Sequence, residues 1–151
     1  MNENIKLTGA VELILRDSDG NIKQEYKDHN LVVTVGKNYL AAWIAAASQA
    51  GEFMDFIALG SGNTAPSASQ TALVTELSGG GYGRVAGALS SALNVWTNVA
   101  TFAPGNGTAT IAEVGLFSAN SAGTMFARAL VGPVTKAAGD TLTVTWNVTF
   151  S

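Results

Sequence analysis

The chain of 151 residues contains no cysteine, a single histidine and few charged side chains. Without cysteine there is no disulfide, no thiol nucleophile and no cysteine-based metal site. Charged residues make up 13% of the chain, about half of the roughly 25% found in an ordinary globular protein. The net charge is −3 and the basic residues are scattered, so the basic patch typical of nucleic-acid-binding proteins is missing. We expect no nucleic-acid partner.

Long apolar runs are also missing. The longest apolar stretch of helical type covers residues 39–47, far fewer than the roughly 20 residues that a membrane span needs. The first four residues are polar and do not resemble a secretory signal. We therefore expect no membrane partner, and the length fits one domain covering residues 1–151.

The sequence does contain many segments whose pattern is typical of β-strands. Residues 9–15, 22–35, 53–59, 93–102, 108–118, 123–131 and 140–150 read as strands separated by Gly, Pro and Asn turns. In the last strand Leu142, Val144, Trp146, Val148 and Phe150 share one face and threonines dominate the other, as in a half-buried antiparallel strand. One helix is predicted from Thr34 to about Gln49, with Leu40, Trp43, Ile44 and Ala47 on its buried face. The fold class is mainly β: an antiparallel β-sandwich or jelly-roll-like domain with one amphipathic helix.

Two glycine-containing segments look like ligand-binding motifs and are better explained as turns or loops. Residues 17–21 place Asp17, Asp19 and Asn21 at calcium-loop spacing, but Ile22 stands where such a loop turns on glycine. A hairpin with Asp19-Gly20 at its tip is the favoured interpretation. Residues 60–65 match a dinucleotide fingerprint, but Pro66 prevents the helix that must follow. We expect no metal site and no cofactor.

Candidate catalytic residues are few. His29 follows Asp28 directly, and adjacent strand residues point to opposite faces, so Asp28 is badly placed to orient the imidazole ring. Glu76 and Glu113 could form a pair of carboxylates only if a cleft brought them together. We predict instead that Glu113 is a structural residue, paired across two strands with Arg128. Folding the hairpin about residues 119–122 places Glu113 opposite Arg128 and Gly115 opposite Phe126. The inventory predicts that the protein is not an enzyme.

Three stretches, in this order, resemble small structural proteins of tailed-bacteriophage heads or tails: residues 30–40 (NLVVTVGKNYL); residues 56–66 (FIALGSGNTAP), running on to Ala72-Leu73; and residues 113–117 (EVGLF), 124–128 (TMFAR) and 140–146 (DTLTVTW).

The resemblance implies a virion protein that works by assembly. Its favoured form is a decoration or cement protein, which would bind the major capsid protein or other virion proteins on the outer capsid surface as a homo-oligomer. A tail, baseplate or fibre-attachment component is the alternative that the resemblance leaves open. A third interpretation, from another class, is a carbohydrate-binding module with Trp43, Trp96 or Trp146 as a stacking platform. The polar N-terminus, composed of Met1, Asn2, Glu3, Asn4, Ile5, Lys6, Leu7 and Thr8, is predicted to act as a tether.

Overall fold

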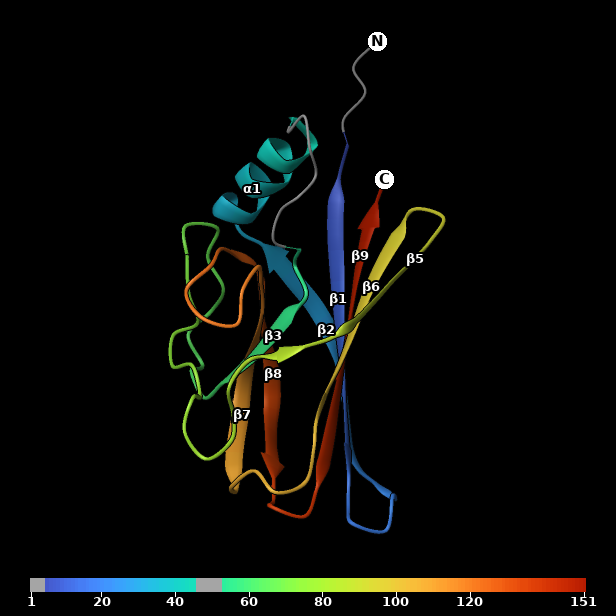
Figure 1. Ribbon diagram of the computed structural model, residues 1–151, viewed down its shortest axis with the longest axis vertical. Coiled ribbons are helices and arrows are strands. Elements are labelled where there is room, and N and C mark those ends of the chain that lie inside the picture. The colour runs from blue at the N-terminus through green and yellow to red at the C-terminus, as the bar shows by residue number, and fades with distance from the viewer. Residues whose placement is uncertain (1–4, 46–52) are drawn as a thin grey trace.

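The computed structural model describes residues 5–45 and 53–151, which form nine strands and one helix (Figure 1). The helix is α1 (Thr34–Ala45), and every strand pairing is antiparallel. The strands are β1 (Leu7–Arg16), β2 (Ile22–Val32), β3 (Phe56–Gly60), β4 (Val85–Ala86), β5 (Ala88–Ala92), β6 (Val95–Phe102), β7 (Ala109–Phe117), β8 (Met125–Lys136) and β9 (Thr141–Phe150). The predicted mainly β, sandwich-like fold with one helix is confirmed.

The sheet is nearly closed. Its strand order is β4-β3-β7-β8-β2-β1-β9-β6-β5, so the two halves of the sandwich share β2. The first part of β2 pairs with β1 as far as Asn30, and Leu31 and Val32 then pair with β8. This change of partner turns one corner of the sandwich.

The opposite corner is turned at Gly87, between β4 and β5. β4 pairs with β3 and β5 pairs with β6, so a single extended segment crosses from one half of the sandwich to the other. The Gly87 N–H donates to the Asp55 carbonyl at 2.7 Å. Asn98 on β6 is buried, and its Nδ2 donates to the Met54 and Asp55 carbonyls. This corner therefore fastens β6 to the chain that leads into β3.

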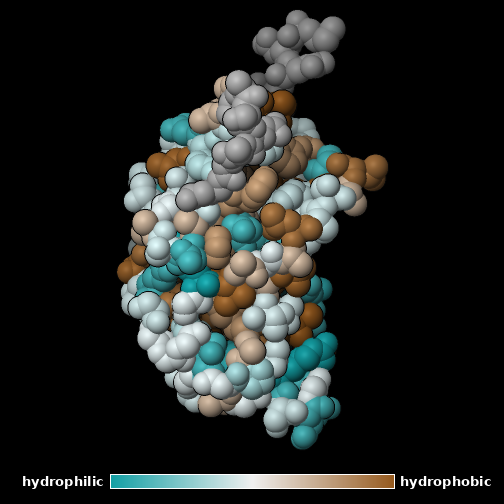
Figure 2. Space-filling view, in the orientation of Figure 1, coloured by the Kyte–Doolittle hydropathy of each residue, from teal (hydrophilic) through white to brown (hydrophobic). Residues whose placement is uncertain are grey.

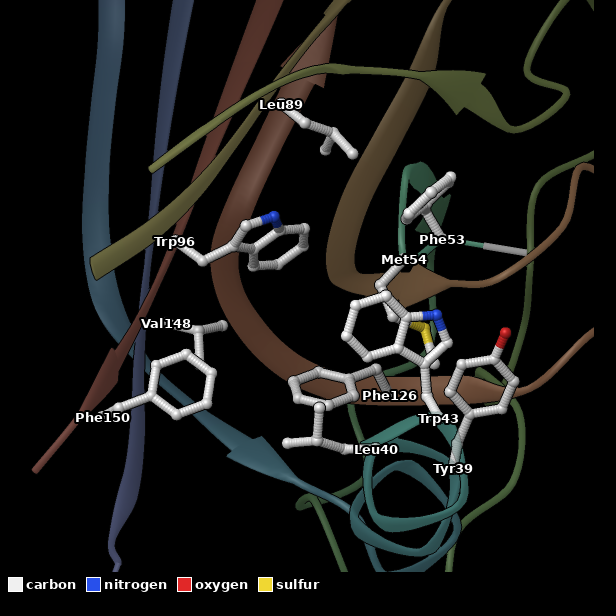
Figure 3. Close-up of a pocket in the computed structure, with 10 residues that line it drawn as sticks. All are labelled: Tyr39, Leu40, Trp43, Phe53, Met54, Leu89, Trp96, Phe126, Val148 and Phe150. Carbon is white, nitrogen blue, oxygen red and sulfur yellow. The ribbon is translucent and has the colours of Figure 1, made fainter. Parts of the chain in front are cut away.

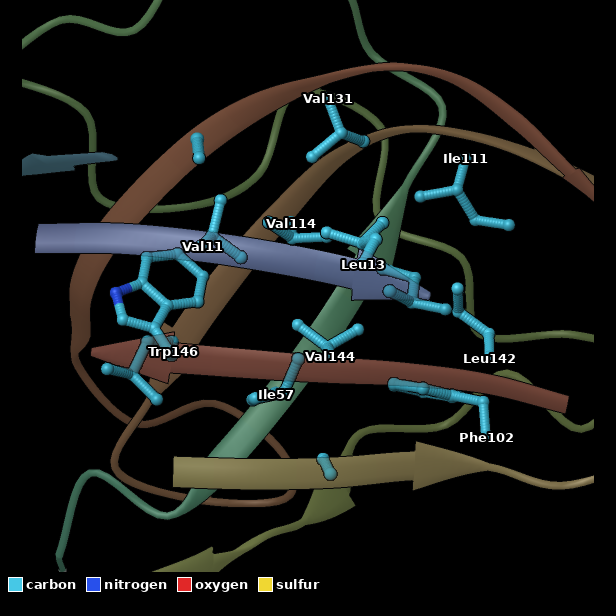
Figure 4. Close-up of a cluster of buried hydrophobic side chains, with 14 of the residues drawn as sticks. Val11, Leu13, Ile57, Phe102, Ile111, Val114, Val131, Leu142, Val144 and Trp146 are labelled. Atoms are coloured by element: carbon cyan, nitrogen blue, oxygen red, sulfur yellow. The ribbon is translucent and has the colours of Figure 1, made fainter. Parts of the chain in front are cut away.

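The core fills the space between the two halves (Figure 4). The strand β9 illustrates how the sequence builds this core. Its apolar residues Leu142, Val144, Trp146 and Val148 are almost completely buried, whereas the residues between them are half-exposed. The apolar residues that alternate along the sequence thus lie on the face toward the core, and the polar residues lie on the face toward solvent, as predicted. Burial of a side chain of this size stabilises the fold by about 1.5–3 kcal/mol.

The β1–β2 hairpin has its tip where the sequence predicts it. The pairing runs from Gly9 opposite Asn30 to Arg16 opposite Ile22. Gly20 has a φ of 87° and donates its N–H to the Asp17 carbonyl. Glycine adopts this left-handed backbone region without the steric cost that a side chain brings.

The predicted register of β7 and β8 is wrong by two residues. Glu113 lies opposite Leu130, and Gly115 lies opposite Arg128. The connection is longer than expected, because Ser118 pairs with Thr124 and the φ of Ala122 and Gly123 is positive. A β-bulge near Phe117 adds a further residue. At Glu113 and Gly115 the error is even, so Glu113 and Arg128 still lie on the same face, as predicted.

The helix α1 begins at Thr34, as predicted, and packs mainly on β8. Gly36 allows this contact, since a Cβ there would lie 2.3 Å from the Phe126 carbonyl oxygen. Leu40 and Trp43 are half-buried, but Ile44 is 66% exposed, so the predicted buried face is wrong at that residue. A helix resting on one strand covers only a narrow stripe of its surface. The predicted residues 46–49, including Ala47, lie outside the described residues.

The predicted N-terminal tether is wrong for its last residues. Leu7 and Thr8 belong to β1 and pair with Phe150 and Thr149 of β9. Lys6 and Ser151 exchange backbone hydrogen bonds at the end of the same ladder. Ile5 is exposed, and Met1, Asn2, Glu3 and Asn4 lie outside the described residues. Residues 6–8 are therefore part of the sheet and cannot form a free arm.

Candidate functional site

Glu113 is a structural hub and not a free acid. Its side chain is fully buried, and its Oε2 lies 2.7 Å from Arg128 Nε. The pair is diagonal across β7 and β8, because the register places them two residues apart. The same carboxylate accepts backbone N–H groups from Gly62, Val74 and Thr75 at 2.7–3.1 Å. It thus fastens the segment after β3 onto the sheet.

The loop that resembles a dinucleotide fingerprint belongs to this hub. Neither Gly60 nor Gly62 has room for a side chain, because a Cβ at either position would lie within 2.6 Å of Glu113 side-chain atoms. The described residues that follow contain no helix until the end of the chain. These glycines allow close packing on a carboxylate, which explains their spacing without a phosphate.

Glu76, the other candidate acid, is also paired. Arg84 Nε and Nη2 donate to its two carboxylate oxygens at 2.7 and 2.9 Å. Arg84 Nη1 donates to the Ala119 and Ala122 carbonyls, and the guanidinium lies 3.6 Å from the centre of the Phe117 ring. The structure gives Glu76 and Glu113 separate basic partners, so a glycosidase-like pair is not formed.

His29 and Asp28 do not form a catalytic pair. The Asp28 carboxylate accepts the backbone N–H of His29 and the hydroxyl of Tyr26, at 2.7 and 3.0 Å. The backbone hydrogen bond is the main cause that lowers the pKa of Asp28. His29 is exposed on the outer face. The carboxylate is therefore engaged by the backbone and by the Tyr26 hydroxyl.

The Asp17 carboxylate is used by its own turn. It accepts the N–H groups of Asp19 and Asn21 and the side-chain amide of Asn21, at 2.9–3.2 Å. The hydrogen bond from the Asn21 backbone is the main cause that lowers the pKa of Asp17. Within residues 5–45 and 53–151, no three His, Asp or Glu side chains gather as a metal site would require.

A charged cluster missed by the sequence analysis lies near the β8–β9 turn. Lys136 is fully buried, and its Nζ donates at 3.5 Å to the Ala137 carbonyl and lies 5.9 Å from the Tyr82 ring centre. Burial lowers the pKa of Lys136, and nearby Asp140 partly opposes this. Asp140 binds Lys23 at 2.7 Å, which is the main cause that lowers its own pKa. An amine this enclosed cannot reach a substrate.

An apolar opening lies where the two halves of the sandwich separate beside α1 (Figure 3). It has a volume of about 280 Å³ and its lining carries no charged residue. The lining comes from α1, the chain before β3, and strands β5, β6, β8 and β9: Tyr39, Leu40, Trp43, Phe53, Met54, Leu89, Trp96, Phe126, Val148 and Phe150. We call it the apolar groove.

The three tryptophans are not gathered on one exposed surface. Trp146 is fully buried in the core. Trp43 and Trp96 are half-buried and line the apolar groove, where Trp43 meets the Phe53 ring edge-on at 6.4 Å between centroids. The buried Nε1 of Trp43 has no hydrogen-bond partner among the described residues. Sugar sites need polar groups directed at hydroxyls, and this groove is nearly devoid of them.

The outer face of β1, β9 and β6 is broad and carries little charge. Five β9 residues on this face are half-exposed, and Thr97 Oγ1 donates to Asn147 Oδ1 at 2.7 Å. Beside β9, Ala10, Glu12 and Ile14 on β1 and Val99 on β6 continue the same face, and Glu12 is paired with Lys27 of β2 at 2.8 Å. The β9 residues are Thr141, Thr143, Thr145, Asn147 and Thr149. We call this surface the threonine face.

Comparisons of the chain with protein-family models, with characterised proteins and with solved structures found no match. Among the described residues, no helix is long and apolar enough to cross a membrane. The residues and surfaces described above are therefore the basis for a functional proposal.

Proposed function

We propose that the chain is a structural protein of a tailed-bacteriophage particle, and that it binds the outside of the capsid as a decoration protein. The observation that carries the proposal is the order of the three sequence stretches that resemble such proteins. The protein works by forming contacts and performs no reaction. Its partner is the major capsid protein or another virion protein.

The three stretches that carry the resemblance pack against one another in the fold. The Thr34 N–H donates to the Ala68 carbonyl, and the Val33 N–H donates to the Phe126 carbonyl. Glu113 holds the backbone of Gly62. Residues from all three stretches thus meet in one unit, where their glycines and acids hold the fold together. Residues in the stretches that carry the resemblance therefore have structural roles in this fold.

The threonine face is the surface we assign to the capsid. Specific interfaces bury about 800 Å² on each partner and their cores are poor in charged residues. A sheet face dominated by half-exposed threonines suits such an interface, because neutral hydroxyls cost less to desolvate than charged groups. Strands on either side of β9 hold the face rigid, so binding requires little ordering.

Particle reconstitution tests the proposal. Purified protein is mixed with capsids that lack it and, separately, with isolated tails, and bound copies are counted. We expect saturable binding to capsids with hundreds of copies per particle, in the range of the capsid protein itself. Binding to tails alone would support the tail interpretation, and binding to neither with affinity for a sugar polymer would support a carbohydrate-binding module.

A matched pair of variants locates the surface. Thr145→Lys places a cation in the middle of the threonine face, opposite Glu12, whose carboxylate already binds Lys27. Ser121→Lys places the same charge in the exposed β7–β8 turn. We expect Thr145→Lys to abolish capsid binding and Ser121→Lys to leave it unchanged, with both melting temperatures close to that of the native protein.

A further inference from the structure

The strand β5 is an unprotected edge of the sheet. It pairs with β6 on one side, and all five of its residues are exposed. Among the described residues, hydrogen bonding along its other side stops at Gly87, whose N–H reaches the Asp55 carbonyl. Beyond that corner the two halves of the sandwich separate around the apolar groove. The edge beyond Gly87 presents peptide groups that can pair with another strand.

Nothing in β5 opposes such pairing. Natural edge strands are shielded by lysine, proline, bulges or very short length. The sequence of β5 is Ala-Leu-Ser-Ser-Ala, without a charge or a proline, and its register with β6 is continuous over five residues. By comparison, β4 at the other end of the sheet has only two residues.

Exposed apolar side chains gather around this edge. Leu93 follows β5, is completely exposed and has a φ of 53°, a region that a leucine rarely adopts. Leu89 on β5 and Phe53 across the groove are 39% and 53% exposed. Figure 2 shows hydrophobic atoms at the projecting tip of the β5–β6 hairpin. The two-residue turn between β5 and β6 accounts for the positive φ, and the full exposure of Leu93 leaves its side chain available to another molecule.

We propose that β5 is a self-association edge, which pairs antiparallel with β5 of a second copy of this chain about a twofold axis at Ser90. In this register Ser90 faces Ser90 of the second copy, Leu89 faces Ser91 and Ala88 faces Ala92. A twofold axis places identical residues together, so a charged strand would repel itself. The neutral, small side chains of β5 meet that requirement.

The groove and the hairpin tip favour the same arrangement. With Ala92 opposite Ala88 of the second copy, Leu93 comes opposite Gly87, which has no side chain of its own to block the approach. Leu89, two residues along the chain from Gly87, lines the apolar groove. An edge of five residues is smaller than a standard interface, so we expect a weak dimer that becomes populated when many copies are held close together.

Disulfide trapping tests the register. The chain has no cysteine, so Ser90→Cys introduces a single thiol. Directly opposite residues have Cβ atoms about 4.5–5.5 Å apart, near the span of a disulfide. Thr101→Cys, exposed on β6 away from the edge, is the control. We expect Ser90→Cys to form a covalent dimer several times faster than Thr101→Cys under mild oxidation, with equal labelling by a maleimide. Equal rates of dimer formation would overturn the proposal.

Charge pairing tests the twofold axis in the full-length protein. We expect the native protein to dimerise with rising concentration in sedimentation velocity, and Ser90→Lys and Ser90→Glu each to remain monomeric. An equal mixture of the two variants restores the dimer. The proposal is overturned if either variant alone dimerises like the native protein, or if the native protein stays monomeric. Because this contact is measured without capsids, its outcome is independent of whether the protein binds a particle.

Discussion

At the scale of single residues, the most consequential feature is a buried ion pair. Glu113 and Arg128 are both inaccessible to solvent, and Arg128 Nη1 also donates to Gln70 Oε1 at 3.2 Å. Glu113 adds three backbone hydrogen bonds. A buried charge without its partner keeps the cost of desolvation and loses the compensating attraction. Removing either member should therefore cost far more than a surface change.

We predict that Arg128→Met lowers the free energy of unfolding by about 3–5 kcal/mol. Lys37→Met, at an exposed position of α1, is the control and should change it by less than about 0.5 kcal/mol. Urea denaturation followed by circular dichroism measures both. A loss below about 1 kcal/mol for Arg128→Met would be the value of a solvated surface pair and would contradict the structure.

Lys136, in contrast, is a buried charged residue that destabilises the fold. Its lowered pKa means that the folded protein binds its proton less tightly than the unfolded chain, whose ordinary value is 10.5. Below the folded pKa the amine is charged in both states and the fold carries the full penalty. Between the folded pKa and 10.5 the unfolded chain binds more protons, so stability rises with pH.

We predict that Lys136→Met stabilises the protein at neutral pH and removes this rise. The free energy of unfolding is measured from about pH 7 to about pH 9.5, below the value of 10.0 at which an ordinary tyrosine titrates. Tyr82, whose pKa is raised by burial, then stays protonated in both states. Equal free energies of unfolding for the native protein and Lys136→Met at about pH 7, together with parallel profiles, would show that the Lys136 amine is not penalised.

At the scale of elements, the corner between β4 and β5 decides whether the sheet closes. Gly87 lies against β6 so closely that a Cβ would be 1.7 Å from Asn98 Oδ1 and 2.9 Å from the Val99 carbonyl oxygen. Asn98 cannot move aside without releasing the two carbonyls that its Nδ2 binds. The constraint is one of space and involves no positive φ.

We predict that Gly87→Ala destabilises the protein by about 1–3 kcal/mol, the range for overpacking. Gly83→Ala is matched, because a Cβ there meets nothing within 4 Å; it should be neutral or stabilise by about 0.4–1 kcal/mol through the unfolded chain. Thermal and urea unfolding give the comparison. Equal effects at the two glycines would mean that the corner is not closely packed.

At the scale of the whole molecule, the two ends of the described chain lie side by side in one sheet (Figure 1). Residues 6–8 pair with the end of β9, which also lies between β1 and β6. Deleting the predicted tether as far as Thr8 would therefore remove sheet pairing together with any attachment. Its role can be tested only with a shorter deletion.

We predict that deletion of residues 1–4 leaves the melting temperature unchanged, whereas deletion of residues 1–8 lowers it by several degrees. One kcal/mol corresponds to about 2–4 °C for a domain of this size. Capsid binding of the shorter deletion then reports on the tether alone. Equal melting temperatures for the two deletions would show that the pairing of Leu7 and Thr8 with β9 contributes nothing.

The sequence alone determined the features that depend on local pattern. The alternation in residues 140–150 predicted which face of β9 is buried, and Asp19-Gly20 predicted the hairpin tip. The same pattern predicted a mainly β fold with one helix, because a period of two residues specifies a half-buried strand wherever that strand lies. The proximity of Glu113 and Arg128 also followed from the scarcity of charge in apolar strands.

Only the tertiary structure decided what depends on residues distant in sequence. The β7–β8 register changed by two residues because of a bulge and a longer connection, neither of which has a local signal. The apolar groove, the Gly87 corner and the open edge of β5 arise where the two halves of the sandwich close or separate. Sequence periodicity specifies the face on which a residue lies, but the neighbour it meets is set by how the whole sheet curves.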